Sequence, residues 1–249
     1  MNILLTNDDG YNASGIMLLY RYFTDKGHSV RMAAPDGQRS AYSQKITVGE
    51  AVSVKHIKDE IYAMSGTPTD CVLYSLREIN GFKPDLVVSG VNDGANVGVD
   101  LIYSGTAAAA RQGAIIGVPS IALSYKYREN HQVMNETLIR EFLDRYFDRM
   151  YELAQDTSTF VNVNFPISSG DDFPAIKTTF ISTGMSYQDK IISFDAPNKK
   201  RYLWIDDPQD TAIMYASLEH GSDAYELLVR HNITISLVEI FPRSKEFTL

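Results

Sequence analysis

Short apolar runs and amphipathic segments alternate along the first part of the chain. Residues 3–5 form an apolar run typical of a buried strand, residues 16–26 carry apolar side chains at helical spacing, and residues 30–34 form a second apolar run. A strand, a helix and a strand in succession predict a βαβ unit with parallel strands. No Gly-x-Gly-x-x-Gly motif follows the first run, so the pattern does not predict a conventional dinucleotide site there.

The same alternation continues to about residue 165. Further strands are predicted at residues 52–57, 61–64, 85–89, 119–124 and 160–165. Helices are predicted from residue 68 to about residue 79, from residue 104 onward, and over residues 135–154. Thr67 is the expected N-cap of the first of these helices, with Pro68 at its first position. Alternating strands and helices predict an α/β fold with a mostly parallel sheet.

The pattern changes beyond about residue 170. Antiparallel strands are predicted at residues 176–182, 190–194 and 201–205, helices at 210–219 and 222–229, and a closing strand at 233–238. We interpret this part, about residues 170–249, as an extension of a single domain that spans residues 1–249 rather than as a second independent domain.

Composition and charge narrow the class of protein. Of the 249 residues, 44% are hydrophobic and 22% are charged, which is ordinary for a globular protein. The formal net charge of −8 argues against binding of DNA or RNA polymers. Cys71 is the single cysteine, so no intrachain disulfide can form, and we expect a buried thiol. Because the sequence has no signal-peptide pattern and no apolar run of membrane-spanning length, we expect a cytoplasmic protein that does not bind membranes.

The first apolar run ends at two adjacent aspartates, Asp8 and Asp9, within the segment Thr-Asn-Asp-Asp-Gly. Asn, Asp and Gly are the usual turn residues, so this segment taken alone favours a polar turn. Adjacent carboxylates repel each other unless a cation neutralises them. The alternative hypothesis is therefore a divalent-metal site at the end of a strand.

Polar residues also follow two other predicted strands. Ser40 lies in the segment after the second strand, and Asn92 follows the strand that ends at Ser89. The carboxyl ends of parallel strands meet at one edge of a sheet, so we expect these side chains to approach the aspartate pair. A set of oxygen ligands without Cys or His favours Mg²⁺, Mn²⁺ or Ca²⁺ over Zn²⁺. This wider pattern favours the metal site over the simple turn.

Ser104, Gly105 and Thr106 open the predicted helix at residue 104. Hydroxyls, backbone N–H groups and the positive end of a helix dipole suit an anion, although simple N-capping explains the same residues. Asn96 either contacts substrate or bonds within its own loop. A metal beside an anion site predicts hydrolysis of a phosphate ester, in which an aspartate orients water, deprotonates water or attacks directly.

A series of motifs covers roughly the first two-thirds of the chain. They lie at residues 3–10, 34–36, 39–40, 66–71, 88–96, 103–106, 117–122 and 161–166. In these motifs, taken in order and with their spacing, the chain resembles the SurE family of metal-dependent nucleotidases.

This resemblance implies a Rossmann-like three-layer domain with a C-terminal extension that exchanges between the subunits of a homodimer or homotetramer. It also implies hydrolysis of nucleoside 5′- and 3′-monophosphates with one Mg²⁺ or Mn²⁺ per subunit, and in some members hydrolysis of polyphosphate. Carried over by position, the metal ligands are Asp8, Asp9, Ser40 and Asn92, of which the two aspartates are also catalytic. The implied phosphate contacts are Ser43, Asn96, Ser104, Gly105 and Thr106.

The chain departs from the family pattern at several positions. Lys45 stands where a small hydroxyl residue is common, and either reaches a second phosphate or points into solvent. His231 and Asn232 stand where Glu-Gly is common before the last strand. All five histidines lie outside the motifs, and we expect surface or structural roles for them: His28, His56, His131, His220 and His231. The rival hypotheses are an exopolyphosphatase, a phosphatase of another metabolite, and a nucleotide-sensing protein without turnover.

Overall fold

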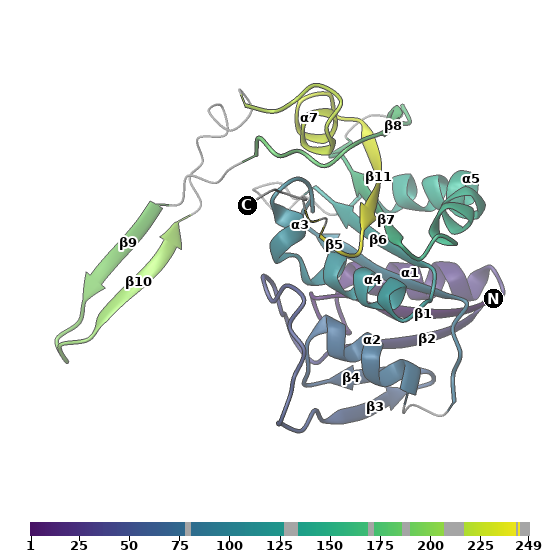
Figure 1. Cartoon of the computed structure of the whole chain (residues 1–249). Helices are drawn as coiled ribbons and strands as arrows, with labels where there is room; N and C mark the ends of the chain where they lie inside the picture. Colours follow the sequence, from purple (N-terminus) through teal and green to yellow (C-terminus); the bar gives the residue numbers. More distant parts are fainter. Residues whose placement is uncertain are drawn as a thin grey trace, which may run out of the picture.

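The chain has an α/β fold around one large sheet (Figure 1). A computed structural model describes residues 1–77, 81–126, 134–168, 172–185, 190–206, 217–242 and 244. Within these residues, nine strands form the large sheet in the order β3-β4-β2-β1-β5-β6-β7-β11-β8, and β9 and β10 form a separate two-stranded sheet. The predicted fold class, a mostly parallel sheet with helices and an added antiparallel part, is confirmed.

Five parallel strands form the centre of the large sheet: β2 (Ser29–Pro35), β1 (Asn2–Thr6), β5 (Leu86–Asp93), β6 (Ser120–Tyr125) and β7 (Thr159–Phe165). On one side β4 (Ile61–Met64) pairs parallel with β2, and β3 (Val54–Lys58) pairs antiparallel with β4. The central strands are almost continuously apolar because helices cover both faces of a parallel sheet.

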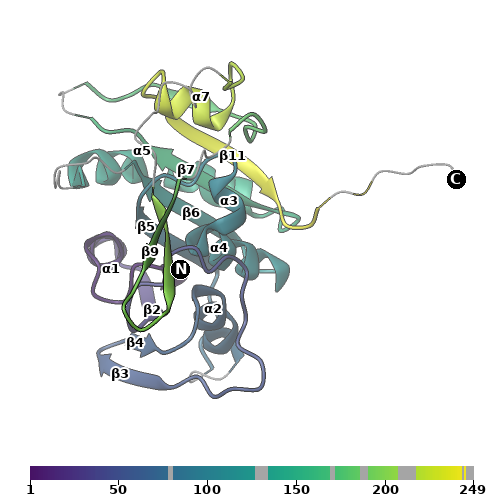
Figure 2. The ribbon, with the colours of Figure 1, turned by 90° about the vertical axis from the view of Figure 1, so that its left-hand side faces the viewer.

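Two pairs of helices cover the two faces of this sheet (Figures 1 and 2). Helices α1 (Ser14–Asp25) and α5 (Glu136–Ala154) pack on one face, where Phe23 and Phe142 are fully buried. Helices α2 (Pro68–Arg77) and α4 (Gly105–Ile115) pack on the other face, where Cys71 is buried as expected. No helix of the described residues is long and apolar enough to span a membrane.

The order of the strands creates a switch point between β1 and β5. From β1 the chain runs through α1 to β2, and from β5 it runs through α4 to β6 on the opposite side. Ligands of open α/β sheets bind at the carboxyl ends of the strands beside such a point. The ends of β1 and β5 are therefore the expected place for a site.

The C-terminal extension partly continues the large sheet. Strand β11 (Ile233–Glu239) pairs antiparallel with β7, and the three-residue β8 (Ile176–Thr178) pairs parallel with β11. The prediction of a longer antiparallel strand at residues 176–182 was wrong, because Phe180 turns away to form a bridge with Ser222 at the start of α7 (Asp223–Leu228).

The remaining predictions for the extension have different outcomes. Strands β9 (Lys190–Asp195) and β10 (Arg201–Asp206) form the predicted antiparallel pair, which stands away from the rest of the chain in Figure 1. The helix predicted at residues 210–219 falls largely on residues 207–216, and that part, like His131, lies outside the described residues.

Candidate active site

The aspartate pair occupies a turn directly after β1. Asn7 fixes this turn, because its side-chain amide donates to the Gly10 carbonyl at 2.9 Å and its Oδ1 accepts from the Gly10 N–H at 3.2 Å. The Asp8 carbonyl in turn accepts a hydrogen bond of 2.6 Å from the Arg39 N–H. The segment that carries Ser40 is thus tied to the backbone of the aspartate turn.

The Asp8 carboxylate is almost fully buried, with 4% of the residue exposed. The Thr106 hydroxyl donates to Asp8 Oδ1 at 2.6 Å. Burial raises the pKa of Asp8, while the Thr106 hydroxyl and the backbone N–H groups of Thr106 and Gly105 act in the opposite direction. The start of α4 is therefore directed at this carboxylate.

Gly105 permits this close approach of α4 to the turn. A Cβ atom at Gly105 would lie 2.9 Å from Asp8 Cβ and 3.0 Å from Asp8 Oδ2. Such distances are shorter than normal van der Waals contact, so any larger residue would displace either the helix or the carboxylate. Steric crowding by Asp8 therefore explains the glycine at position 105 independently of phosphate binding.

Asp9 is only partly buried, and its Oδ2 accepts a hydrogen bond of 3.1 Å from the Asp93 N–H. The pKa of Asp9 is raised to about 6, first by burial and then by the negative charge of Asp8. The two carboxylates thus repel each other in the folded chain, and a bound cation would relieve this repulsion.

Asn92 lies on β5 itself, whereas the sequence predicted a strand that ends at Ser89. The pairing of β5 with β6 is irregular between Ser89 and Asn92 and then resumes, so the strand continues to Asp93. Asn92 Oδ1 lies 3.4 Å from Thr106 Oγ1. The Thr106 hydroxyl has one proton and lies closer to Asp8, so it donates mainly to Asp8. The Asn92 side chain therefore lies beside the hydroxyl that bonds Asp8.

The segment with Ser40 and Ser43 closes another side of the site. Ser40 is exposed, and its Oγ accepts from Gln38 Nε2 at 3.0 Å. Ser43 donates from its hydroxyl to the Ile102 carbonyl at 2.7 Å and from its N–H to the Tyr103 carbonyl at 3.0 Å. Ser43 therefore fixes this segment to α3 (Asp100–Tyr103), a short helix that the sequence pattern did not predict.

These groups surround a small pocket of about 150 Å³. It is lined by Asp8, Ser40, Ala41, Asn92, Asp93, Ala95, Asn96, Asp100, Tyr103 and Ser104. Five of the nine predicted site residues are in this set, and three more touch or adjoin Asp8 or Asn92. Ser43 lies behind Tyr103. Asp93, Asp100 and Tyr103 were missed. Asp93 and Tyr103 lie within the motifs at residues 88–96 and 103–106, whereas Asp100 lies between these motifs and no sequence signal marked it.

Asn96 and Ser104 make structural bonds as well as line the pocket. Asn96 is buried, its side-chain amide donates to Ser124 Oγ at 2.8 Å, and its backbone N–H donates to Asn164 Oδ1 at 2.7 Å. Ser104 is the N-cap of α4, since its Oγ accepts from the Ala107 N–H at 2.9 Å. For Ser104, capping the helix and lining the pocket are therefore compatible. Asn96 bonds to β6 and β7 rather than within its own loop, so that alternative was wrong for these bonds.

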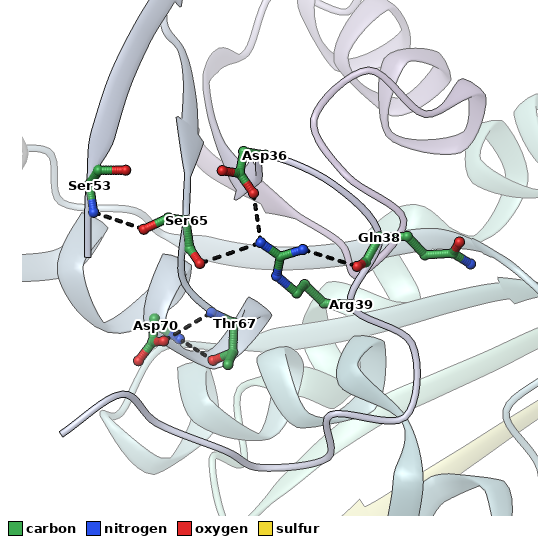
Figure 3. Close-up of polar contacts among 7 residues, drawn as sticks. All are labelled: Asp36, Gln38, Arg39, Ser53, Ser65, Thr67 and Asp70. Atoms are coloured by element: carbon green, nitrogen blue, oxygen red, sulfur yellow. Dashed lines mark hydrogen bonds and ion pairs between the residues drawn. The ribbon is translucent and has the colours of Figure 1, made fainter. Parts of the chain in front are cut away.

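A second, larger pocket of about 390 Å³ lies beside Arg39, whose polar contacts are drawn in Figure 3. It is lined by Arg39, Tyr42, Lys45, Thr47, Glu50, Ala51, Val52, Ser65, Gly66 and Thr67. The Arg39 guanidinium donates to Asp36 Oδ1 at 2.7 Å and to the Gln38 carbonyl at 3.1 Å. The exposed Lys45 ammonium lies 5.4 Å from the centre of the Tyr42 ring and forms no ion pair with the described residues.

The donor set of the smaller pocket suits a hard divalent cation. No three His, Cys, Asp or Glu side chains are arranged to hold a metal within the described part of the chain. A cation here would depend on two carboxylates, Asp8 and Asp9, together with neutral oxygens such as those of Ser40 and Asn92. Mg²⁺ commonly binds through one or two carboxylates, with waters and substrate phosphate as the other ligands.

Comparisons of this chain with protein families, with individual proteins and with solved structures point to the same family. A family described as "Survival protein SurE" matches residues 3–188. A protein of Thermoanaerobacter sp. (strain X514), named 5′-nucleotidase SurE, is 36% identical over 82% of this chain and 81% of its own. A Thermosipho melanesiensis protein of the same name is 34% identical over 99% of this chain and 94% of its own. The crystal structure of the SurE protein from Aquifex aeolicus superposes with a TM-score of 0.80 at 30% identity, over 97% and 94% of the two chains.

Proposed function

The chain belongs to the SurE family, and from this premise we propose that it is a divalent-metal-dependent 5′-nucleotidase that hydrolyses nucleoside monophosphates to nucleoside and phosphate. The observation that carries the proposal is the buried Asp8 carboxylate beside Asp9, at the strand switch point and under the start of α4. The names of the relatives supply the substrate class, and we extend the proposal to 3′-monophosphates.

We propose that Asp8, Asp9, Asn92 and Ser40 hold one Mg²⁺ or Mn²⁺. When bound, such an ion lowers the pKa of a water ligand and offsets the charge that develops on a phosphoryl group. Thr106 holds the Asp8 carboxylate in one orientation through its 2.6 Å hydrogen bond. The backbone of Asp93 does the same for Asp9 through its N–H.

The phosphate would lie in the smaller pocket, between Asn96 and the start of α4. This pocket, of about 150 Å³, has room for an ion and a phosphate. The positive end of α4, an 11-residue helix, adds a favourable potential for an anion there. Ser104 fixes this helix end by its capping bond, so the site is formed before substrate arrives.

The nucleoside would extend into the larger pocket beside Arg39. Its volume of about 390 Å³ is within the usual range for small-molecule sites. Tyr42 is 40% exposed there and offers a ring face to a base. The Lys45 ammonium in the same pocket, which forms no ion pair with the described residues, favours a second candidate activity, the removal of terminal phosphate from short polyphosphate.

We also propose that the chain forms homodimers or homotetramers through the β9–β10 hairpin. Both faces of this hairpin carry exposed apolar side chains, among them Ile192, Trp204, Leu203 and Ile205. Exposed apolar surface of this kind marks an interface in many proteins. A second copy of the chain is the partner that the family resemblance suggests.

The decisive assay measures phosphate release from a panel of nucleoside monophosphates and short polyphosphate, with Mn²⁺, with Mg²⁺ and with chelator. We expect release from nucleoside monophosphates that requires metal, and an Asp9→Ala variant slower by at least about a thousandfold, because charge stabilisation by a metal is worth several kcal/mol. No release with any substrate and metal would favour the sensor hypothesis. Release that survives chelation or Asp9→Ala would contradict the metal mechanism.

A further inference from the structure

Asp223, in the C-terminal extension, is a fully buried carboxylate outside the proposed metal site. Three backbone N–H groups donate to it: Gly98 to Oδ2 at 2.9 Å, Ser182 to Oδ1 at 2.8 Å and Ala224 to Oδ1 at 2.7 Å. A buried carboxylate is costly to keep unless such donors satisfy it. Asp223 thus joins three segments that are far apart in sequence.

One of these segments is part of the pocket wall. Gly98 lies between Asn96 and Asp100, which both line the smaller pocket. Gly98 adopts a left-handed backbone conformation, with φ of +52°, and a Cβ at this position would lie 2.9 Å from the Met185 sulfur. The extension therefore approaches the back of the wall as closely as a glycine permits.

Apolar packing supports the same contact. Val97 is 1% exposed and belongs to a buried cluster with Met185 and Leu227, both from the extension. The pocket side of residues 96–100 thus carries polar groups, while their other side rests on the extension. Helix α7, which begins at Asp223, is labelled at the top of Figure 1.

We propose that Asp223 is a positioning residue, which holds Asn96 and Asp100 in the pocket by accepting the hydrogen bond from the Gly98 N–H. The C-terminal extension is then part of the active site of its own chain, in addition to any role in association. The catalytic half of this inference rests on the proposed function, and the structural half does not.

Glu219 provides a matched control in the same extension. Its carboxylate accepts bonds from the Ser182 hydroxyl at 2.6 Å, the Thr183 hydroxyl at 2.8 Å and the Gly184 N–H at 3.0 Å. These bonds fix a neighbouring turn, and among the described contacts none reaches residues 96–100. Loss of this carboxylate tests the general stability of the extension without removing the bond to the pocket wall.

The experiment compares Asp223→Asn and Glu219→Gln in the full chain. Hydrogen exchange followed by mass spectrometry reports protection of residues 96–100, and steady-state kinetics with a nucleoside monophosphate and Mn²⁺ report kcat and KM.

For Asp223→Asn we expect exchange at residues 96–100 faster by at least about tenfold, because local opening becomes easier. We also expect kcat lower by about 10- to 100-fold with a smaller change in KM, because small misplacements of positioning groups reduce rates on this scale. Glu219→Gln should match the wild type at residues 96–100 and retain kcat within about twofold, because Ser182 can still donate its N–H to Asp223 and no described bond of Glu219 is made to residues 96–100.

Wild-type exchange and kcat in Asp223→Asn would overturn the inference, as would equal losses in both variants. If Asp223→Asn does not fold, Met185→Ala tests the same contact from its apolar side and should raise exchange at residues 96–100, and an unchanged rate there would overturn the inference. If the wild-type protein releases no phosphate, the proposed function fails, and the exchange measurements still decide whether Asp223 holds the pocket wall.

Discussion

A single hydroxyl orients the buried carboxylate of the candidate site. Replacing Thr106 with Val removes the 2.6 Å hydrogen bond to Asp8 and keeps the shape of the side chain. A hydrogen bond to a charged group is worth about 1.5–3 kcal/mol, so we expect kcat/KM for a nucleoside monophosphate to fall by roughly 10- to 100-fold. Thr106→Ser, which keeps the hydroxyl, should retain most of the activity.

Thr69 supplies the control for this prediction. Its hydroxyl is buried in α2 without a hydrogen-bond partner among the described residues. Thr69→Val removes a hydroxyl from a similar environment and should leave kcat/KM unchanged and stability equal or higher, because an unpaired buried hydroxyl is unfavourable. Equal activity of Thr106→Val and Thr69→Val would show that the contact with Asp8 has no catalytic role.

The approach of α4 to the aspartate turn depends on a missing side chain. In Gly105→Ala the added methyl group would lie 2.9 Å from Asp8 Cβ, so the carboxylate must move. We expect kcat to fall by about 100-fold, the scale of a misplacement near 1 Å, as measured in the phosphate-release assay. Gly37→Ala is the matched control, because the nearest atom to its added methyl group is an Arg39 nitrogen at 3.7 Å, and it should retain activity.

At the scale of elements, local patterns predicted the strands and helices that carry the site. β1, α2 and α4 follow from apolar runs and N-cap residues, which act over a few positions. The continuation of β5 through Asn92 was not predictable, because it depends on pairing with β6 beyond an irregular register. The contact of Asp223 with Gly98 joins positions far apart in sequence, and no local pattern reports it.

The β9–β10 hairpin carries large apolar side chains that are exposed to solvent. Leu203 and Ile205 lie on one face of β10 and are 64% and 71% exposed, an apolar surface that a second copy would cover. We expect Leu203→Glu with Ile205→Glu to shift the protein toward monomers in analytical ultracentrifugation, while activity per subunit falls little. A charge change at Lys199, in the turn of the hairpin, should leave the oligomeric state unchanged.

An assembly that survives Leu203→Glu with Ile205→Glu would place the interface elsewhere on the chain. The opposite face of the hairpin, with Trp204 paired to Ile192, gives a second test of the same element. If both faces tolerate charge without dissociation, the hairpin is not the interface. Loss of folding is not expected, since β9 and β10 form a sheet separate from the large one.

At the scale of the whole molecule, the site joins elements that the fold brings together from distant parts of the sequence. Asp8 and Asp9 follow β1, Asn92 belongs to β5, and Thr106 belongs to α4. A cation held by Asp8, Asp9 and Asn92 would link the end of β1 to β5, and it would bind the folded chain far better than the unfolded one. Metal binding should therefore stabilise the protein against heat as well as enable catalysis.

This linkage gives a test that is independent of turnover. At a Mn²⁺ concentration 100 times its Kd, the expected stabilisation is about 2.7 kcal/mol, which corresponds to a Tm increase of roughly 5–10 °C for a domain of this size. Asp9→Asn should abolish most of this increase.

The same variant should melt at a higher temperature than the wild type when chelator is present, because the repulsion between the two carboxylates is gone. An Asp9→Asn protein that keeps the full Mn²⁺ shift would contradict the assignment of Asp9 as a ligand, and one that is less stable without metal would contradict the repulsion between the two carboxylates. A gain in stability that accompanies the loss of metal binding is the behaviour of a site whose charges are held together for function at a cost to the fold.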